Sequence, residues 1–513
     1  MLQRIDLDDF DAILPSKRVV FDHKIYSSRL KEVDYEFTIQ SGFDWKDPSF
    51  PPDMRSIVDE SLDENRHLPE WETLCWKRPK DVYGKQNIPF TIFETIGPND
   101  VKQGRCGDCY FLASLSSLAE HPDRVKNIFI TKEVNEAGCY AVNLFVNGER
   151  RTVVVDDYFP YDEDNERWAF SRPSEEEDEK NGKTTKEIWV LILEKAWAKV
   201  YGSYQRIEAG LAGEAFNALT GCPHRFYRHS AIKEKDALKE RNRLFATILQ
   251  ADKLKYPMCA AVAARADDGL NEVDMDEAGL QDEHCYSLIG ATVLKLDNGK
   301  EERLIKIRNP QGRKEWTGDW CDSSPRWTPA TKAQVNLVEE DDGTFWIAFK
   351  DYISFFYLTT ICHHDESLQG SVIADQHEPD GFGLAGLDLA EDHTEPITFS
   401  INQYNERLVD QAVRRTYRYP SIKLILTQVV QSEDKEGKTR RQQVFVHGTF
   451  EAGTPHCMIS FSSGLPKGRY ILMYQSKFPE EHEERKLAVT LHARQGMELH
   501  RTDETTYTEY RWL

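Results

Sequence analysis

The sequence has no apolar run of about 18 residues, the length that a membrane-spanning helix needs. Its first residues, Met1 to Asp9, lack the pattern of a signal peptide, and its ten cysteines lack the regular spacing of a disulfide framework. Positive charge is also scarce: the net charge of −22 argues against nucleic-acid binding and against general attachment to anionic membranes. These absences predict a soluble cytoplasmic protein with reduced thiols, whose surplus carboxylates could serve divalent cations.

One glycine-rich loop leads directly into a predicted helix, at residues 103–113 with the sequence QGRCGDCYFLA. Cys109 would lie in the first turn of that helix, where unpaired N–H groups and the positive end of the helix dipole favour a thiolate. Gln103 could donate an amide N–H to negative charge that develops beside the sulfur. The stretch therefore predicts a cysteine nucleophile with part of an oxyanion hole.

Other roles for this cysteine are open at this point. Most cysteines are inert buried residues, and Cys106 with Cys109 could also form a redox pair or half of a zinc site. The sequence offers no second Cys/His pair at metal spacing and no redox-type βαβ context. These observations favour the nucleophile, provided that histidine and asparagine partners follow downstream.

The pattern Cys-Gly-x-Cys-Tyr is the local form of papain-type nucleophiles, and its variant here closely resembles the calpain family of cysteine proteases. Residues 47–52 and 76–79 resemble the entry to a calpain protease core, and residues 187–199 resemble the helix that packs behind the nucleophile helix. The resemblance covers roughly residues 43–361. It implies a papain-like core with two subdomains.

His284 and Asn309 are the expected partners of the cysteine. Each stands at one end of a strand-like segment, and each alone would usually be structural. In the order Cys, His, Asn the three residues predict a catalytic triad, in which the histidine moves the thiol proton and the asparagine fixes the imidazole tautomer. Their surroundings resemble the histidine and asparagine motifs of calpains. A transglutaminase-like triad normally ends in Asp, so Asn309 argues against that acyl transfer.

The predicted fold class is α+β: a two-subdomain papain-like cysteine protease core followed by an antiparallel β-sandwich. We expect an N-terminal extension (1–42), a subdomain with the nucleophile helix (43–209), a subdomain with His and Asn on a β-sheet (210–362), a Gly-, Asp-, Glu- and His-rich linker (363–395) and a calpain-type β-sandwich (396–513). The acidic run 175–179 predicts a solvated loop.

The resemblance also implies two calcium sites, one in each subdomain. Asp100 and Glu187 match carboxylate ligands of the first, with backbone carbonyls from the segment 95–97. The second is matched by Glu315, Asp322 and Asp342, and it should bind more weakly because Thr344 replaces an acidic ligand of the family. Any one of these carboxylates alone would be an ordinary solvated charge. No EF-hand loop follows the predicted sandwich strands, so no EF-hand small-subunit interface is expected, and the segment 274–285 also lacks the ligands of such a loop.

Two positions depart from the calpain pattern in a way that bears on activity. Glu283 stands where calpains commonly have Gly and, if it pointed inward, could raise the pKa of His284. Gln311 replaces a Trp that shields the Asn–His pair, which predicts altered gating or a wetter pair. The predicted function is a calcium-dependent cysteine endopeptidase that performs limited proteolysis on protein substrates. The alternative is a calpain-fold scaffold with weak or no protease activity, whose β-sandwich docks proteins or membranes.

Overall fold

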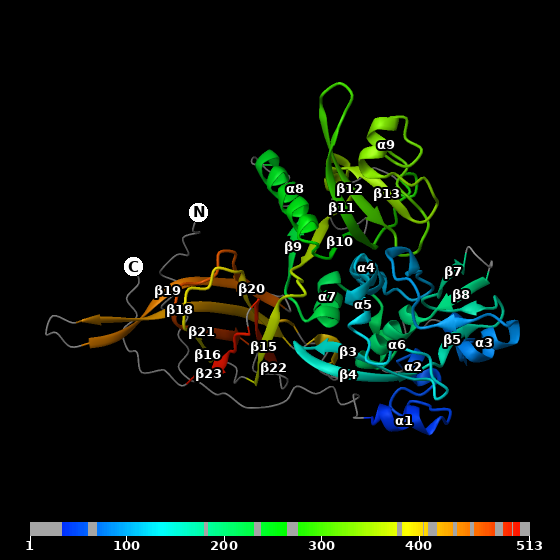
Figure 1. The fold of residues 1–513 in the computed structure, drawn as a ribbon, viewed down its shortest axis with the longest axis horizontal. Coiled ribbons are helices and arrows are strands. Elements are labelled where there is room, and N and C mark those ends of the chain that lie inside the picture. The colour runs from blue at the N-terminus through cyan, green and yellow to red at the C-terminus, as the bar shows by residue number, and fades with distance from the viewer. Residues whose placement is uncertain are drawn as a thin grey trace. The chain divides into compact units, whose positions relative to one another are not determined.

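The computed structural model describes residues 33–59, 69–178, 183–229, 237–263, 275–376, 382–403, 405–408, 418–433, 439–451, 456–477, 486–494 and 496–502 (Figure 1). The chain divides into two compact units. The first unit comprises Ser28–Leu144 and Arg151–Asp365, and the second contains Phe145–Arg150 and the chain from Glu366 onward. Of the helices in the described ranges, none is long and apolar enough to cross a membrane.

Helix α4 (Cys109–Leu118) is the centre of the first unit's amino-terminal half, which we call the nucleophile half. Every residue from Tyr110 to Leu118 is buried, because the helix is apolar or small on all sides. It packs on α6 (Trp189–Tyr201): the rings of Phe111 and Trp197 stack with centroids 5.1 Å apart, and Trp197 Nε1 donates to the Tyr110 hydroxyl (3.1 Å). The other helices of this half are α1 (Tyr35–Ser41), α2 (Met54–Ile57), α3 (Pro79–Gln86) and α5 (Pro122–Lys126).

Short strands complete the nucleophile half. They form the sheets β1-β5-β6 (Cys75–Lys77, Phe159–Asp162, Arg167–Trp168) and β2-β8-β7 (Phe90–Thr91, Lys183–Glu187, Ser174–Asp178), and the pair β3 (Cys139–Val146) and β4 (Glu149–Asp156). The prediction of a loop at residues 175–179 is wrong, because residues 175–178 belong to β7 and pair with β8. The neighbouring strand supplies the hydrogen bonds that the acidic sequence alone does not suggest.

A six-stranded antiparallel sheet organises the rest of the first unit, which we call the sheet half. Its order is β13-β12-β11-β10-β14-β9, with bounds Thr344–Ala348, Glu301–Arg308, Cys285–Lys295, Met258–Ala261, Leu358–Cys362 and His224–Arg228. Helices α7 (Ala212–Thr220), α8 (Ala237–Lys253), α9 (Pro329–Val335) and α10 (Phe349–Phe355) accompany it, with α8 against β11 (Figure 1). Ser287 of β11 pairs with Arg308 of β12, so the start of one strand lies beside the end of the other.

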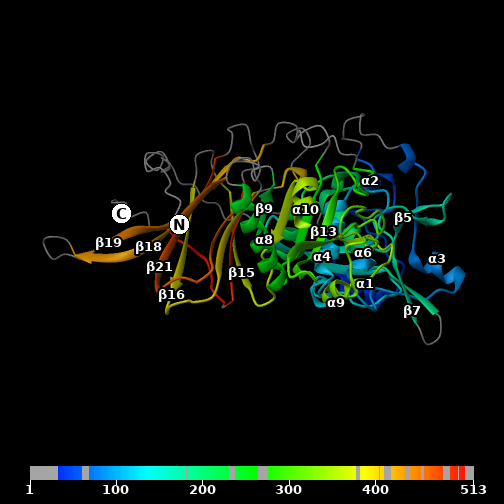
Figure 2. The ribbon, with the colours of Figure 1, turned by 90° about the horizontal axis from the view of Figure 1, so that it is seen from above.

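The second unit holds two antiparallel sheets that share one apolar core (Figure 2). One has the order β15-β22-β17-β20 (Gln369–Gln376, Lys486–Ala493, Ile397–Gln403, His456–Phe461), and the other β19-β18-β21-β16-β23 (Thr439–Glu451, Ser421–Glu433, Gly468–Lys477, Phe382–Leu389, His500–Arg501). The predicted linker 363–395 is therefore too long, because β15 and β16 lie within it and pair into these sheets. Its polar composition concealed the apolar face of β16, whose inward residues share the core.

Candidate active site

His284 and Asn309 are hydrogen-bonded to one another. His284 comes directly before β11 and Asn309 directly after β12, and the distance between His284 Nε2 and Asn309 Oδ1 is 2.9 Å. The amide of Asn309 is oriented by its other end, since Nδ2 donates to the carbonyls of Arg313 (2.7 Å) and Lys314 (3.2 Å). Its oxygen must therefore face the imidazole, which places the ring proton on Nε2 and leaves Nδ1 to exchange a proton.

Cys109 begins α4, at the first turn, as the sequence predicts. Its thiolate is not favoured, however: although the side chain is partly exposed, desolvation, with Cys285 and Asp108 nearby, raises the pKa of Cys109 to about 12. Loss of hydration outweighs the helix dipole, whose effect is typically only about 0.3–1 kcal/mol at exposed sites. Within the described ranges no hydrogen bond joins Cys109 to His284, so the third contact of the predicted triad is not formed.

Gln103 is buried and spans the two halves of the first unit. Its backbone N–H donates to the carbonyl of Pro310 (2.9 Å), and its side-chain Nε2 donates to the carbonyl of Cys106 (2.7 Å). One amide hydrogen is thus committed to the nucleophile loop, and the second remains for an oxyanion. The contact to Pro310, directly after Asn309, ties the position of this amide to the sheet half.

The resting state of the histidine also differs from one expectation. Burial, together with the charge of Lys314, lowers the pKa of His284 to about 4, although the hydrogen bond to Asn309 opposes this shift. Glu283 is exposed and does not act on the imidazole. It does have a left-handed backbone, with φ 50°, a conformation in which Gly is favoured. The left-handed backbone at this position therefore explains why the calpain pattern has Gly there.

These ionisation states predict how Cys109 reacts in a chelating buffer. Thiol and imidazole are both neutral between the pKa values of about 4 and about 12. Alkylation of Cys109 by iodoacetamide should therefore rise about tenfold per pH unit from about pH 6 to pH 9, because only the growing thiolate fraction reacts. Mass spectrometry of the Cys109 peptide, with Cys109→Ser as the blank, measures the rate. A plateau that begins below about pH 7 would instead indicate a thiolate–imidazolium pair.

The carboxylates of the first predicted calcium set, Asp100 and Glu187, are hydrogen-bonded to protein donors in this structure. Asp100 lies in the 3₁₀ turn η4 (Pro98–Asp100), where its Oδ2 accepts the N–H of Gly97 (2.7 Å). Glu187 is fully buried, with one oxygen accepting the N–H of Glu94 and the other the hydroxyl of Ser174 (2.8 Å). Each carboxylate thus accepts at least one hydrogen bond from a protein donor, which a bound cation would have to share or displace.

The second predicted set fits the chemistry of calcium better. Glu315, Asp322 and Asp342 act on one another: burial and the other carboxylates raise the pKa of Glu315 to about 7 and that of Asp322 to about 6. Both carboxylate oxygens of Asp322 are buried without a hydrogen bond of normal geometry, although the Glu340 backbone partly stabilises its charge. Hard cations seek such oxygens. The described residues nevertheless include no group of three or more acidic, His or Cys side chains arranged to hold a metal.

A cavity of about 420 Å³ brings parts of both predicted sets together. Its lining includes residues 95–100 from the nucleophile half and Asp322, Asp342 and Thr344 from the sheet half. The sequence predicted two separate sites, one in each half. In the structure Asp100 of the first and two carboxylates of the second face the same cavity.

Sequence reasoning missed the residues that join the two halves. Arg308, at the end of β12, is fully buried and donates across the boundary to three acceptors: Asn99 Oδ1 (2.9 Å), Val101 O (2.9 Å) and Ser116 Oγ (3.3 Å). Asn99 in turn donates from Nδ2 to Asp342 Oδ2 (2.7 Å). Burial lowers the pKa of Arg308 to about 10, and the charges of Asp342 and Asp100 oppose this. In the sequence, only the position of Arg308 directly before Asn309 indicates that this arginine could belong to the site.

Comparison with known proteins gives a consistent assignment. The family model "Calpain family cysteine protease" matches residues 45–363. The calpain-type cysteine protease ADL1 of Oryza sativa subsp. japonica is 31% identical over 369 residues, which are 70% of this chain and 16% of that protein. Calpain-13 of Rattus norvegicus is 30% identical over 65% of this chain and 47% of its own length. The calpain-1 catalytic subunit of Mus musculus is 30% identical over 63% of this chain and 42% of its own length. The chain thus spans less than half the length of these relatives.

Proposed function

Because the chain belongs to the calpain family of cysteine proteases, we propose that it is a calcium-dependent cysteine endopeptidase that performs limited proteolysis in the cytoplasm. The observation that carries the proposal is the 2.9 Å hydrogen bond between His284 and Asn309, in a sheet that packs on the helix begun by Cys109. The hydroxyl of Ser287 in β11 donates to the carbonyl of Ala113 in α4 (2.8 Å), which fixes strand against helix. Nucleophile, base and orienting amide are thus held on adjoining elements.

In the proposed mechanism His284 Nδ1 accepts the proton of the Cys109 thiol as the sulfur attacks the scissile carbonyl. The amide N–H of Gln103 that is not bound to Cys106 stabilises the developing oxyanion, and the backbone N–H groups at the start of α4 add to it. The imidazolium then protonates the leaving amine, and water hydrolyses the acyl-enzyme. Asn309 accepts the Nε2 hydrogen throughout, which holds the ring in the required tautomer.

Calcium is proposed to be held by Glu315, Asp322 and Asp342, where it would neutralise carboxylates that repel one another. Two of these residues connect with the boundary between the halves. Asp342 accepts from Asn99, and its charge helps to stabilise the buried Arg308. The charge state of the acidic set is therefore coupled to the contacts that place the nucleophile half against the sheet half. Asp100 and Glu187 remain second candidates, which would first have to release the donors that now bind them.

The proposal predicts calcium-stimulated cleavage of a quenched fluorogenic peptide. Calcium at millimolar concentration should raise kcat/KM at least about tenfold over a chelating buffer, whereas Cys109→Ala should stay at the blank under both conditions. Asp322→Asn should require more calcium for the same effect, since it removes a charge from the acidic set. Titration calorimetry of Cys109→Ser measures the binding separately from turnover.

The controls separate the two predicted functions. Asp123→Asn, an exposed substitution at the start of α5, should leave the calcium response unchanged. Calcium binding in the calorimeter, without cleavage of any peptide, would favour the alternative of a scaffold without protease activity. Equal cleavage with and without calcium, together with no calcium binding in the calorimeter, would contradict the calcium dependence but not the protease activity.

A further inference from the structure

Two carboxyl groups lie buried behind the nucleophile without a cation. Asp108 is the residue before Cys109 and the N-cap of α4, and Glu194 lies in α6; their exposed fractions are 0% and 2%. Across the described ranges neither forms an ion pair with a lysine or arginine. Each of the two groups interacts with the other through its side chain, and two buried carboxylates that interact cannot both be ionised at low cost.

The hydrogen bonds indicate which of the two carries the charge. Glu194 accepts from the backbone N–H of Ser171 with both oxygens (2.9 and 3.1 Å), and from the Ser171 hydroxyl (2.8 Å). These donors stabilise the ionised form of Glu194. If Asp108 and Glu194 were both ionised, each could only accept hydrogen bonds. Neither carboxylate oxygen of Asp108 would then have a hydrogen-bond partner. A proton on Asp108 removes this deficit, because the resulting hydroxyl can donate to Glu194.

We propose that Asp108 and Glu194 share one proton, and that this carboxyl–carboxylate pair is a positioning device that holds Cys109 at the start of α4. The inference deepens the proposed protease function and concerns the same site. Asp108 does not touch the substrate. It acts through the backbone of the next residue, which is the nucleophile.

The rest of the nucleophile loop is held in a similar way. The carbonyl of Cys106 accepts from Gln103 Nε2, the N–H of Gly107 donates to Glu208 Oε1 (3.2 Å), and the N–H of Arg105 donates to the carbonyl of Ala169 (2.9 Å). Ala169 precedes Ser171 by two residues, so the segment that binds the loop also binds Glu194. The shared proton connects Asp108, through Glu194, to this same segment.

The surroundings of the pair favour keeping the proton at neutral pH. Burial and the charges of Glu194 and Glu208 raise the pKa of Asp108 well above its usual value, and burial raises the pKa of Glu194 to about 7. The other titratable groups that face the pair are Cys106, Tyr204 and Cys109, and burial raises the pKa of each, so all three stay neutral. Among the described residues no lysine or arginine pairs with either group, so no cation replaces the proton when it leaves. Its loss in alkaline solution should therefore displace the loop.

The kinetic test compares two substitutions of Asp108. Asp108→Ala removes the donor and should lower kcat at least about tenfold with little change in KM, because the nucleophile is misplaced while the substrate contacts remain. Asp108→Asn donates from its amide without a proton to lose, and should recover most of that loss. It should also weaken the alkaline decline of kcat that we expect for the wild type. If turnover is undetectable, the alkylation rate of Cys109 serves in place of kcat.

An infrared measurement tests the proton independently of activity. A protonated carboxyl group has a carbonyl band that carboxylates lack, and the wild-type protein at pH 7 should lose the intensity of one such group in Asp108→Asn. The exposed substitution Asp123→Asn should leave the band unchanged. An unchanged band in Asp108→Asn overturns the shared proton, even if the protein is an active protease. A lost band with a fully active Asp108→Ala overturns the positioning role.

Discussion

Lys195→Met is expected to lower the free energy of unfolding by about 3–5 kcal/mol, because it leaves a buried carboxylate without its cation. Lys195 and Asp156 are both fully buried, and the ammonium of Lys195 pairs with Asp156 Oδ1. The ammonium also donates to the carbonyl of Tyr158 (2.5 Å) and lies 5.0 Å from the ring centroid of Trp76. Methionine fills the space of the lysine stem but supplies neither charge nor donor.

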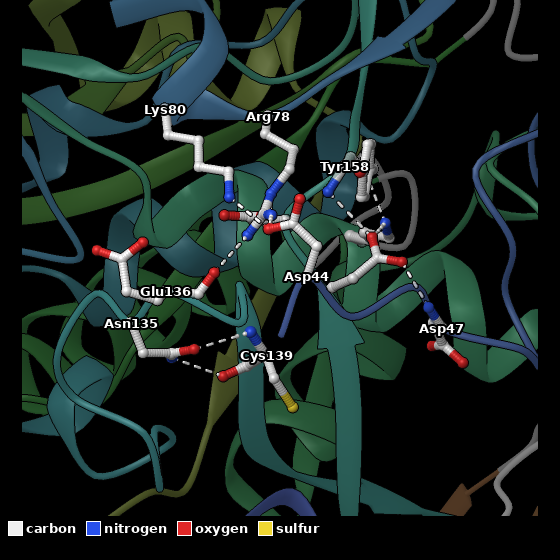
Figure 3. Close-up of polar contacts among 11 residues, drawn as sticks. Asp44, Asp47, Arg78, Lys80, Asn135, Glu136, Cys139 and Tyr158 are labelled. Atoms are coloured by element: carbon white, nitrogen blue, oxygen red, sulfur yellow. Dashed lines mark hydrogen bonds and ion pairs between the residues drawn. The ribbon is translucent and has the colours of Figure 1, made fainter. Parts of the chain in front are cut away.

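The charge of Asp156 is costly to leave unpaired, because this carboxylate also holds the surrounding backbone through hydrogen bonds. Its Oδ2 accepts the N–H of Asp47 (2.7 Å), and its Oδ1 accepts the N–H of Tyr158 (3.0 Å). Asp47 in turn pairs with Lys199 Nζ (2.6 Å), one helical turn beyond Lys195 on α6. Figure 3 shows the edge of this network, with Asp47 and Tyr158 on one side and Arg78 and Lys80 converging on Asp44.

Urea unfolding followed by tryptophan fluorescence measures the loss, since ten of the eleven tryptophans lie between residues 45 and 346. Lys332→Met is the matched control: its ammonium pairs with Glu339 (2.7 Å) at the surface, and its removal should cost less than about 1 kcal/mol. Adding Asp156→Asn to Lys195→Met should restore part of the stability. A loss no larger than that of the surface control would contradict the buried-charge argument.

The sequence was sufficient where chemistry depends on residues close together in the chain or on matched motifs. The start of a helix at Cys109 follows from a glycine loop before an apolar run, and the structure begins α4 at that residue. His284 and Asn309 could be named from their motifs. Their 2.9 Å contact, however, depends on the register of β11 against β12, which no local pattern specifies.

Burial and long-range pairing account for what the sequence could not supply. The pKa of Cys109 lies opposite to the prediction, because the desolvation of a side chain depends on its packing in the folded protein. Asp108 and Glu194 are 86 positions apart, so no local sequence pattern predicts their interaction. The acidic composition of β7 predicts a loop, because composition indicates solvation but does not reveal the partner strand β8.

Asn309→Ala should lower kcat/KM by about 10²-fold, mainly through kcat, because the imidazole loses the acceptor that selects its tautomer. The buried Nε2–H of His284 is then without its 2.9 Å partner, and a flipped ring or the other tautomer becomes competitive. Substrate contacts are not altered directly, so KM should change little.

The sharper measurement repeats Asn309→Ala in a His284→Ala background, using the alkylation rate of Cys109 where turnover is too slow. If Asn309 acts through the imidazole, its removal has no further effect once the imidazole is gone, and the two substitutions are strongly non-additive. Asn309 also binds the carbonyls of Arg313 and Lys314, and a purely structural role of that kind would persist without the histidine. Full additivity would therefore assign Asn309 to the fold of the 309–314 turn and remove it from the proposed triad.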